Sequence, residues 1–362
     1  MDDLIATLDG SFRNGNASAD SAAVDTGRSQ PRFSELYKSQ GDRSLDKAQE
    51  RRRRERLDQQ KQRRFDFTSR ARQLALEQFD DFAGSDEDDD NDEQQVSTEP
   101  LDCSTSHTAP DASAEKQRRA KNEKRRRERN YYYKNHLMLS EWLVDIPAQL
   151  DAEWTMVACP VGRRLLVVAA KGFTSAYTKS GYRLLQFNSL LPGGSRNGHG
   201  YTLLDCVYAE AERVLFVLDV ICWNGQAVAD SETDFRFFWA GCKLAETAGI
   251  EAREHRNAYP FRPLPHCDCT KEKMEELVAS EMPFKAELDG LLFYHKRCHY
   301  ERGVTPLVGW LKPFMLPEIL GVQVPPRFLK DQSAAAFIAE FNAARADRSA
   351  HSPGQRQTME QS

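Results

Sequence analysis

The sequence predicts an α+β domain over residues 131–326, made of antiparallel sheets with flanking helices, after a long charged N-terminal arm. From position 131 onward, short runs rich in Val, Leu, Phe and Tyr alternate with Gly, Pro, Asn and Asp, as strands alternate with turns. Few helical stretches separate these runs, which favours antiparallel pairing over βαβ units. Residues 1–130 lack a sustained apolar pattern, so they cannot bury enough apolar surface to offset chain entropy.

The expected elements follow one another closely within the domain. Strands are expected at 154–160, 163–171, 181–187, 201–209, 213–223, 235–241, 289–296 and 307–313. Helices are expected at 136–143, 274–281 and 333–346. The domain is long enough for one sizeable core. Residues 327–362 are expected to hold the last short helix and a disordered tail.

The arm opens with a segment, residues 1–15, whose apolar residues fall at helical spacing. Met1, Leu4, Leu8 and Phe12 share one face of such a helix. A helix this short is marginal alone. The pattern leaves two interpretations open: a set of anchors for a groove on a partner protein, or a frayed terminus.

Residues 30–78 contain a strongly basic stretch that predicts a long helix. Between Arg43 and Arg72, twelve basic residues stand against five acidic ones, and no Gly or Pro interrupts them. The apolar positions are too sparse for a core-facing helix, so we expect an acidic protein partner. A nuclear localisation run and nucleic-acid binding are alternatives, although the interspersed Glu and Asp would repel phosphate.

Residues 79–130 are expected to be a disordered charged linker. This segment holds an acidic run at 80–93 with nine acidic residues, and a second basic run at 115–130. Ser85, followed by acidic residues, is a candidate phosphorylation site. The second basic run is compatible with a localisation signal, an RNA-contacting arm or an intramolecular partner of the acidic run.

The overall composition argues against several protein classes. No apolar run is long enough to cross a bilayer, and the N-terminus lacks the pattern of a secretory signal, so no membrane partner is expected. Eight scattered cysteines suit a reducing compartment. The HCDC stretch at 266–269 has no second half that would complete a zinc site, so neither a metal nor a cofactor is expected.

The order of motifs in the domain resembles that of a family of nucleotide-handling enzymes. The motifs are CPVGRR (159–164), TLLDC (202–206), FVLDV (216–220), DGLLFYHK (289–296) and WLKP (310–313). Covalent nucleotidyltransferases, the mRNA capping guanylyltransferases and nucleic-acid ligases, begin this order with Lys-x-Asp-Gly-x-Arg. Gly162 and Arg164 match that turn, whereas Cys159 stands in place of the nucleophilic lysine. The resemblance implies a guanylyltransferase-like nucleotide-binding domain without the amine that forms a covalent phosphoramidate.

The chain resembles the snurportin family of import adaptors more closely. The stretches that carry this resemblance are LSEWL, TSAYTKSGY, SLLPGG, TDFRFFW, DGLLFYHK and TPLVGWLKP, in the same order. The match covers the N-terminal stripe, the basic helix and the domain, and fails at 94–130 and after Arg327. It implies a non-enzymatic protein that binds the 2,2,7-trimethylguanosine cap of small nuclear RNAs. It also implies shuttling between cytoplasm and nucleus.

The resemblance also implies the residues that bind the base of the cap. Trp310 matches the stacking tryptophan, and N7-methylation gives the base a positive charge that favours an indole face. Leu139, Ser140 and Trp142 match the segment that packs the first nucleotide and the methylated edge. Because N2 dimethylation removes the hydrogen-bond donors, an apolar contact such as Trp142 suits that edge.

The resemblance implies cationic contacts to the phosphates as well. They correspond to Arg164, Lys179 and Ser180, with Thr178 beside them, and Lys312 and Lys296 are further candidates. Some residues are expected in the core instead: Trp154, Trp223, Trp239 and Cys159.

Two protein partners are implied by the arm. The basic helix corresponds to the importin-β-binding segment, and the expected contacts are Arg51, Arg52, Arg53, Arg54, Arg56, Arg63, Arg64, Arg70 and Arg72. The stripe of Met1, Leu4, Leu8 and Phe12 corresponds to the segment that engages a nuclear export receptor.

Two alternative functions stay open. One is an active nucleotidyltransferase with Lys171 or Lys179 as nucleophile, and the other is a general RNA-binding protein acting through its basic runs.

Overall fold

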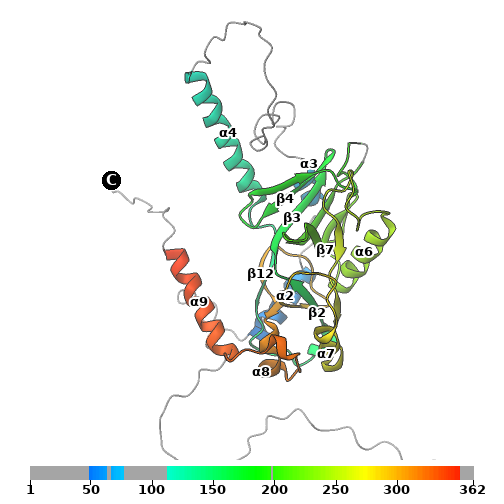
Figure 1. The fold of residues 1–362 in the computed structure, drawn as a ribbon, viewed down its shortest axis with the longest axis vertical. Helices are drawn as coiled ribbons and strands as arrows, with labels where there is room; N and C mark the ends of the chain where they lie inside the picture. The colour runs from blue at the N-terminus through cyan, green and yellow to red at the C-terminus, as the bar shows by residue number, and fades with distance from the viewer. Residues whose placement is uncertain (1–48, 63–66, 77–111, 197–198, 351–362) are drawn as a thin grey trace, which may run out of the picture.

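The computed structural model describes residues 49–62, 67–76, 112–196 and 199–350, and it confirms the predicted α+β class (Figure 1). The strands are β1 (Met138–Trp142), β2 (Trp154–Pro160), β3 (Arg163–Ala170), β4 (Phe173–Thr178), β5 (Arg183–Phe187), β6 (Thr202–Ala209), β7 (Val214–Trp223), β8 (Gln226–Ala227), β9 (Phe261–Pro263), β10 (His266–Asp268), β11 (Leu288–His295) and β12 (Gly303–Leu311). The helices are α2 (Gln49–Gln62), α3 (Phe67–Leu76), α4 (Ala112–Tyr133), α5 (Leu150–Glu153), α6 (Thr233–Glu246), α7 (Lys271–Ala279), α8 (Leu316–Leu320) and α9 (Ala334–Ala350), with 3-10 turns η2 (Pro313–Met315) and η3 (Pro326–Phe328).

The first sheet places the WLKP motif (310–313) close to Cys159 of the CPVGRR turn (159–164). Its strand order is β1-β12-β11-β2-β10. β11 pairs antiparallel with both β2 and β12, whereas β1 pairs parallel with β12. The register sets Gly290 opposite Cys159 and Leu292 opposite Trp310. Residues from widely separated motifs are therefore neighbours in this sheet.

The second sheet contains Arg164 of the CPVGRR turn, which lies on β3. Its order is β5-β4-β3-β6-β7-β8, and β9 joins β7 in parallel. β6 and β7 are buried along their whole length, as expected of strands that are covered on both faces. Their register sets Asp205 opposite Asp219. Two carboxylates thus lie side by side in the interior of the domain.

The main core lies between the two sheets. Val157 and Leu292 of the first sheet and Leu166 and Phe216 of the second belong to one buried cluster. α6 packs on the outer side of the second sheet, against β7. α7, α8 and α9 pack on the outer side of the first sheet. The domain is therefore layered as helix, sheet, sheet and helices.

Two elements of the domain correct the sequence prediction. Residues 235–241, predicted as a strand, lie within α6, whose buried residues recur at helical spacing: Thr233, Arg236, Phe237, Ala240 and Leu244. Residues 136–143, predicted as a helix, contain β1, because pairing with β12 overrides the local preference. β4 was not among the expected strands, although its residues belong to the TSAYT stretch.

The N-terminal arm also differs from the prediction. The basic stretch forms two helices, α2 and α3, and both contact the domain. α3 contributes Ala71, Leu74 and Ala75 to the core between the sheets. Residues 112–130, expected as disordered linker, belong to α4, which projects away from the sheets (Figure 1). The acidic run at 80–93 lies outside the described residues.

None of the helices that the structure describes combines the length and the apolar composition needed to cross a membrane.

Candidate nucleotide-binding site

The indole of Trp310 forms a partly exposed platform on β12. Its ring lies against Gly290 of β11: a Cβ built on Gly290 would stand 2.5 Å from Cη2 and 2.8 Å from Cε2 of the indole. Those distances are too short for any side chain, so only glycine leaves room for the ring. Gly290 of the DGLLF motif therefore leaves open the space that the indole of Trp310 occupies.

Cys159 is the neighbour of Gly290 in the sheet, and its thiol is unreactive. It pairs with Gly290 across β2 and β11, and only 4% of it is exposed. Burial raises the pKa of its thiol to about 12, although the positive charge of Arg164 acts in the opposite direction. A buried, protonated thiol is a poor nucleophile. The predicted core role of Cys159 is confirmed.

Arg164 begins β3 just after the cysteine turn and is held by a buried carboxylate. Its Nε and Nη2 donate to the two oxygens of Asp205 at 2.9 and 2.8 Å, and Tyr300 donates to the same carboxylate at 2.7 Å. Although burial opposes its charge, the contact with Asp205 raises the pKa of Arg164 well above its usual value. The Arg164 side chain is 20% exposed. The guanidinium is thus fixed in place by Asp205, and the side chain as a whole is not completely buried.

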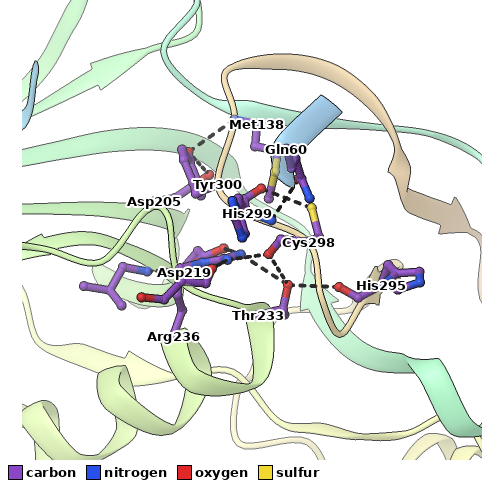
Figure 2. Close-up of polar contacts among 12 residues, drawn as sticks. Gln60, Met138, Asp205, Asp219, Thr233, Arg236, His295, Cys298, His299 and Tyr300 are labelled. Atoms are coloured by element: carbon purple, nitrogen blue, oxygen red, sulfur yellow. Dashed lines mark hydrogen bonds and ion pairs between the residues drawn. The ribbon is translucent and has the colours of Figure 1, made fainter. Parts of the chain in front are cut away.

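A second arginine engages the neighbouring carboxylate. Arg236 donates to both oxygens of Asp219 at 2.9 Å, and both side chains are fully buried. Figure 2 shows that Arg236 also donates to the Cys298 carbonyl, and that Asp205 is bonded separately to Tyr300. Asp205 and Asp219 are therefore each paired with an arginine. Across the described ranges, no three His, Cys, Asp or Glu side chains gather in a way that could hold a metal ion.

The predicted phosphate loop joins β4 to β5. Lys179 and Ser180 are exposed, and the hydroxyls of Thr178 and Ser180 share a hydrogen bond of 2.9 Å. The carbonyl of Lys179 accepts a hydrogen bond from the Asn135 amide at 2.9 Å. This bond ties the loop to the segment that leads into β1, where three of the predicted base contacts lie.

The predicted contacts on β1 have different environments. Leu139 and Ser140 are partly exposed, whereas Trp142 is only 7% exposed. Helix α9 covers Trp142, because the rings of Phe337 and Phe341 meet the indole edge-on with centroids 6.1 and 5.4 Å away. Trp142 is therefore packed in the core in this conformation, and its contact with the methylated edge of the base stays a prediction. The sequence pattern does not reveal this packing because it joins distant parts of the chain.

The structure separates the two lysines that were further candidates. Lys312 lies at the platform: its Nζ is 5.5 Å from the centroid of Trp310 and forms an ion pair with Asp289. Lys296 follows the far end of β11 and pairs with Asp268 at 2.8 Å. Lys312 is thus near the candidate site, and Lys296 is not.

The remaining tryptophans belong largely to the core, as predicted. Trp154 and Trp223 are buried. Trp239 on α6 is half-buried, packs against the core, and has the Nζ of Lys243 4.8 Å from its centroid. Its cation contact resembles that of Trp310, but none of the nucleotide motifs surrounds it.

Helix α2 docks on this domain through an arginine that is almost completely buried. Arg53 is 2% exposed, and it donates to the carbonyls of Asp145 at 2.7 Å and Pro306 at 3.3 Å. Its guanidinium also lies 5.2 Å from the centroid of Trp154. Burial lowers the pKa of Arg53, and the nearby carboxylates partly offset this effect.

Two further arginines of α2 pair with acidic residues of the domain. Arg52 lies 2.5 Å from Glu141, and Arg56 lies 2.7 Å from Glu301. Glu141 is itself buried, on β1. The acidic partner predicted for the basic helix is thus, in this conformation, the chain's own domain.

The other predicted arm contacts fall into two groups. Arg51, Arg54 and Arg72 are exposed, and Arg70 is half-buried. The following lie outside the described residues: Arg63, Arg64, Met1, Leu4, Leu8 and Phe12.

Sequence reasoning missed two residues that organise the site. Gly290 leaves room for the indole of Trp310, and Asp205 orients Arg164. Both lie inside motifs that the sequence had already singled out, DGLLF and TLLDC, so the motif order was the signal that could have identified them.

Two family models match the chain. One, described as the Snurportin1 m3G cap-binding domain, matches residues 136–313. The other, described as Snurportin1, matches residues 31–73. The first match contains Trp310, Arg164 and the phosphate loop, and the second contains α2.

Solved structures similar to this chain include ligase domains. The ligase domain of LigD from M. tuberculosis aligns with 15% identity and a TM-score of 0.32, over 48% of this chain and 58% of that one. A mycobacterial DNA ligase D complexed with ATP aligns with 14% identity and a TM-score of 0.31, over the same shares. A Lig E DNA ligase aligns with 14% identity and a TM-score of 0.32, over 48% of this chain and 67% of that one. This chain thus spans little more than half the length of the first two.

Proposed function

Because the chain belongs to the snurportin family, we propose that it is a nuclear import adaptor that binds the 2,2,7-trimethylguanosine cap of spliceosomal small nuclear RNAs. The observation that carries this proposal is the Trp310 platform, seated on Gly290 within the segment that matches the cap-binding domain. The adaptor links the capped particle to importin-β and shuttles between cytoplasm and nucleus. It works by binding and not by catalysis.

The platform suits the methylated base. N7-methylation leaves a positive charge on the guanine, and a cation is attracted to the face of an indole. Stacking of a base on an aromatic ring contributes about 1–3 kcal/mol. One face of Trp310 rests on Gly290, so the residue is positioned before the ligand arrives. Little entropy is then lost when the base binds.

The phosphate bridge is assigned to three cations and one hydroxyl. Arg164 is fixed by Asp205, and Lys179 and Ser180 lie in an exposed loop. Lys312 is the fourth member, since it already lies beside the ring. Fixed guanidinium and hydroxyl donors recognise phosphate oxygens well. The pocket thus retains phosphate contacts while Cys159 leaves it without a nucleophile.

The methylated edge of the base is assigned to β1. Leu139 and Ser140 are partly exposed and lie on the strand next to β12, where Trp142 is the register partner of Trp310. Trp142 joins them when α9 moves away from its indole, since Phe337 and Phe341 occupy that space in the present conformation. Truncation after Ser333 removes α9, and it should strengthen cap binding if Trp142 is a ligand contact.

The arm is assigned to the transport receptors. In the proposed division of the chain, residues 1–15 engage the export receptor and residues 30–78 engage importin-β. The linker covers 79–130, the cap-binding domain covers 131–326, and the tail follows. A receptor that wraps α2 has to displace the buried Arg53 first, so importin-β binding requires α2 to leave the domain.

Substitution of the platform tests the cap assignment. Trp310→Ala should abolish binding of a fluorescent trimethylated cap analogue while leaving importin-β binding intact. Trp239→Ala is the matched control, because Trp239 is also a partly exposed tryptophan with a lysine near its ring. If Trp310→Ala left cap binding unchanged, or if both bindings were lost together, the site assignment would be wrong.

A covalent assay tests the enzymatic alternative. The protein is incubated with radiolabelled GTP and Mg²⁺, denatured, and examined for labelled protein. We expect no adduct, because Cys159 occupies the position of the lysine and its thiol is buried. A stable adduct on Lys171 or Lys179 would overturn the non-enzymatic assignment.

A further inference from the structure

A basic groove borders the candidate cap site, and of its lining cations only Arg70 falls in the segment assigned to importin-β. It has a volume of about 1020 Å³ and lies among α3, the end of α4 and the start of β12. We define it by its lining cations and its aromatic wall: Arg70, Arg127, Lys134, His136, Arg302, Tyr131 and Tyr132.

A smaller cavity of about 210 Å³ borders the groove. The two share Arg70, Leu74, His136 and Arg302 in their walls. Tyr300 also lines the smaller cavity, and its hydroxyl contacts the carboxylate that holds Arg164. One residue therefore separates this cavity from the ion pair of the cap site.

The groove carries a concentrated positive charge. Arg70 is half-buried, and burial followed by the positive charge of Arg302 lowers its pKa. Burial lowers the pKa of His136, and the charges of Arg70 and Arg302 act in the same direction. Within the described ranges, the ion pairs identified for acidic lining residues are with other cations: Glu301 with Arg56 and Glu128 with Lys124. Arg127 pairs with Glu123 at 3.0 Å, whereas no ion pair is identified for Arg70, Lys134 or Arg302 among the described residues. Cations gathered in this way are stabilised by an anionic ligand.

The groove is built by tertiary contacts that hold its walls in place. The hydroxyls of Tyr132 and Tyr133 donate to the carbonyls of Gln73 and Leu74 at the end of α3, at 2.7 and 3.2 Å. These bonds fasten α3 to the segment that leads into β1. Tyr131 stays 82% exposed at the rim, so its ring is open to a stacking partner.

The groove begins where the phosphate loop ends. Asn135 lines the groove, and its amide donates to the carbonyl of Lys179. On the other side, Gly303 lines the groove and pairs with Met138, directly before Leu139. A chain that leaves the cap at the phosphate loop therefore meets Asn135, Lys134 and His136 next.

We propose that the basic groove holds the phosphodiester backbone of the single-stranded RNA nucleotides that follow the cap, with Arg70 and Arg302 on phosphates and Tyr131 stacked on a base. This inference rests on the proposed cap-binding function. Cationic grooves with exposed aromatic rings are the usual sites for single-stranded nucleic acid. The groove adds affinity for the RNA body, and the cap pocket supplies selectivity.

A length series of RNA ligands tests the groove. The full-length protein is titrated with a trimethylated cap dinucleotide, a capped oligonucleotide of about twelve nucleotides, and the same oligonucleotide without a cap. The wild type should bind the capped oligonucleotide more tightly than the dinucleotide. The double variant Arg70→Gln/Arg302→Gln should bind both capped ligands alike, with a loss of roughly ten- to hundredfold for the longer one.

Salt dependence gives a second readout. Each phosphate contact on single-stranded RNA contributes about 0.7 to the slope of log K against log salt, so the double variant should lower the slope by about 1.4. The matched control is Arg253→Gln/Arg256→Gln, which changes two exposed arginines away from the groove lining. It should change neither slope nor affinity. Unchanged dinucleotide affinity in both variants establishes that the cap pocket is intact.

The failures of the two proposals are distinguishable. If the wild type did not bind the dinucleotide, the proposed cap function would fail. If it bound the dinucleotide and the capped oligonucleotide equally, only the groove inference would fail. If Arg302→Gln, which lies outside the segment assigned to importin-β, kept its affinity for the longer RNA but lost importin-β binding, the groove would belong to a protein partner.

Discussion

Substitution of Gly290 by alanine changes the residue that the indole of Trp310 packs against and leaves the indole chemically unchanged. The new Cβ would stand 2.5 Å from Cη2 of the ring, whereas ordinary contact begins at 3.4 Å. The indole therefore has to move by at least about 1 Å, or β11 has to shift. The backbone of Gly290 is not in the left-handed region, so alanine introduces no conformational strain of that kind.

The expected effect on binding follows from the stacking energy. If displacement removes most of the stacking contribution of about 1–3 kcal/mol, the Kd for a trimethylated cap analogue should rise roughly 5- to 150-fold. Overpacking should also lower the free energy of unfolding by about 1–3 kcal/mol. Fluorescence titration measures the first effect, and urea denaturation measures the second.

Gly241→Ala is the matched control for this variant. Gly241 lies inside α6, and a Cβ there would meet nothing within 4 Å. It should leave the Kd unchanged and raise stability by up to about 1 kcal/mol, because alanine is the better helix former. A folded Gly290→Ala protein with wild-type affinity would refute the argument, since it would mean that the position of the Trp310 ring does not matter for binding.

Three further predictions concern the interior and the docked helix. Arg236→Met should lower the free energy of unfolding by about 3–5 kcal/mol, because it leaves the buried carboxylate of Asp219 unpaired; denaturant unfolding would contradict this if the loss were below about 1 kcal/mol. Cys159 should resist maleimide at pH 8 in the native protein, since burial raises its pKa to about 12, whereas the less buried Cys242 should react; mass spectrometry of labelled peptides decides this. Glu141→Gln should strengthen importin-β binding several-fold by weakening the docking of α2, and calorimetry that found weaker or equal binding would count against release of that helix.

The motif order in the sequence predicted much of the site. The turn at Cys159 and Arg164, the DGLLF strand and Trp310 come together in the structure because they lie on adjacent strands or face each other across the core. Buried apolar runs such as β6 and β7 have an unmistakable pattern, so these strands were predicted almost to the residue.

Contacts between distant parts of the chain could not be predicted from local sequence patterns. Local composition favours a helix for the segment that holds β1, yet its partner β12 lies far along the chain. Trp142 was expected at the ligand because nothing near it in sequence indicates that Phe341 covers it. Likewise, the pairing of Arg52 with Glu141 depends on a fold that the basic run itself does not encode.

The central claim is that the Trp310 pocket binds the trimethylguanosine cap, and parallel titrations test it most directly. The wild type and Trp310→Ala are titrated with trimethylated and monomethylated cap analogues under the same salt conditions. We predict that the wild type binds the trimethylated analogue more tightly than the monomethylated one, and that Trp310→Ala binds neither. Equal affinity of the wild type for both analogues, or unchanged binding by Trp310→Ala, would contradict the claim.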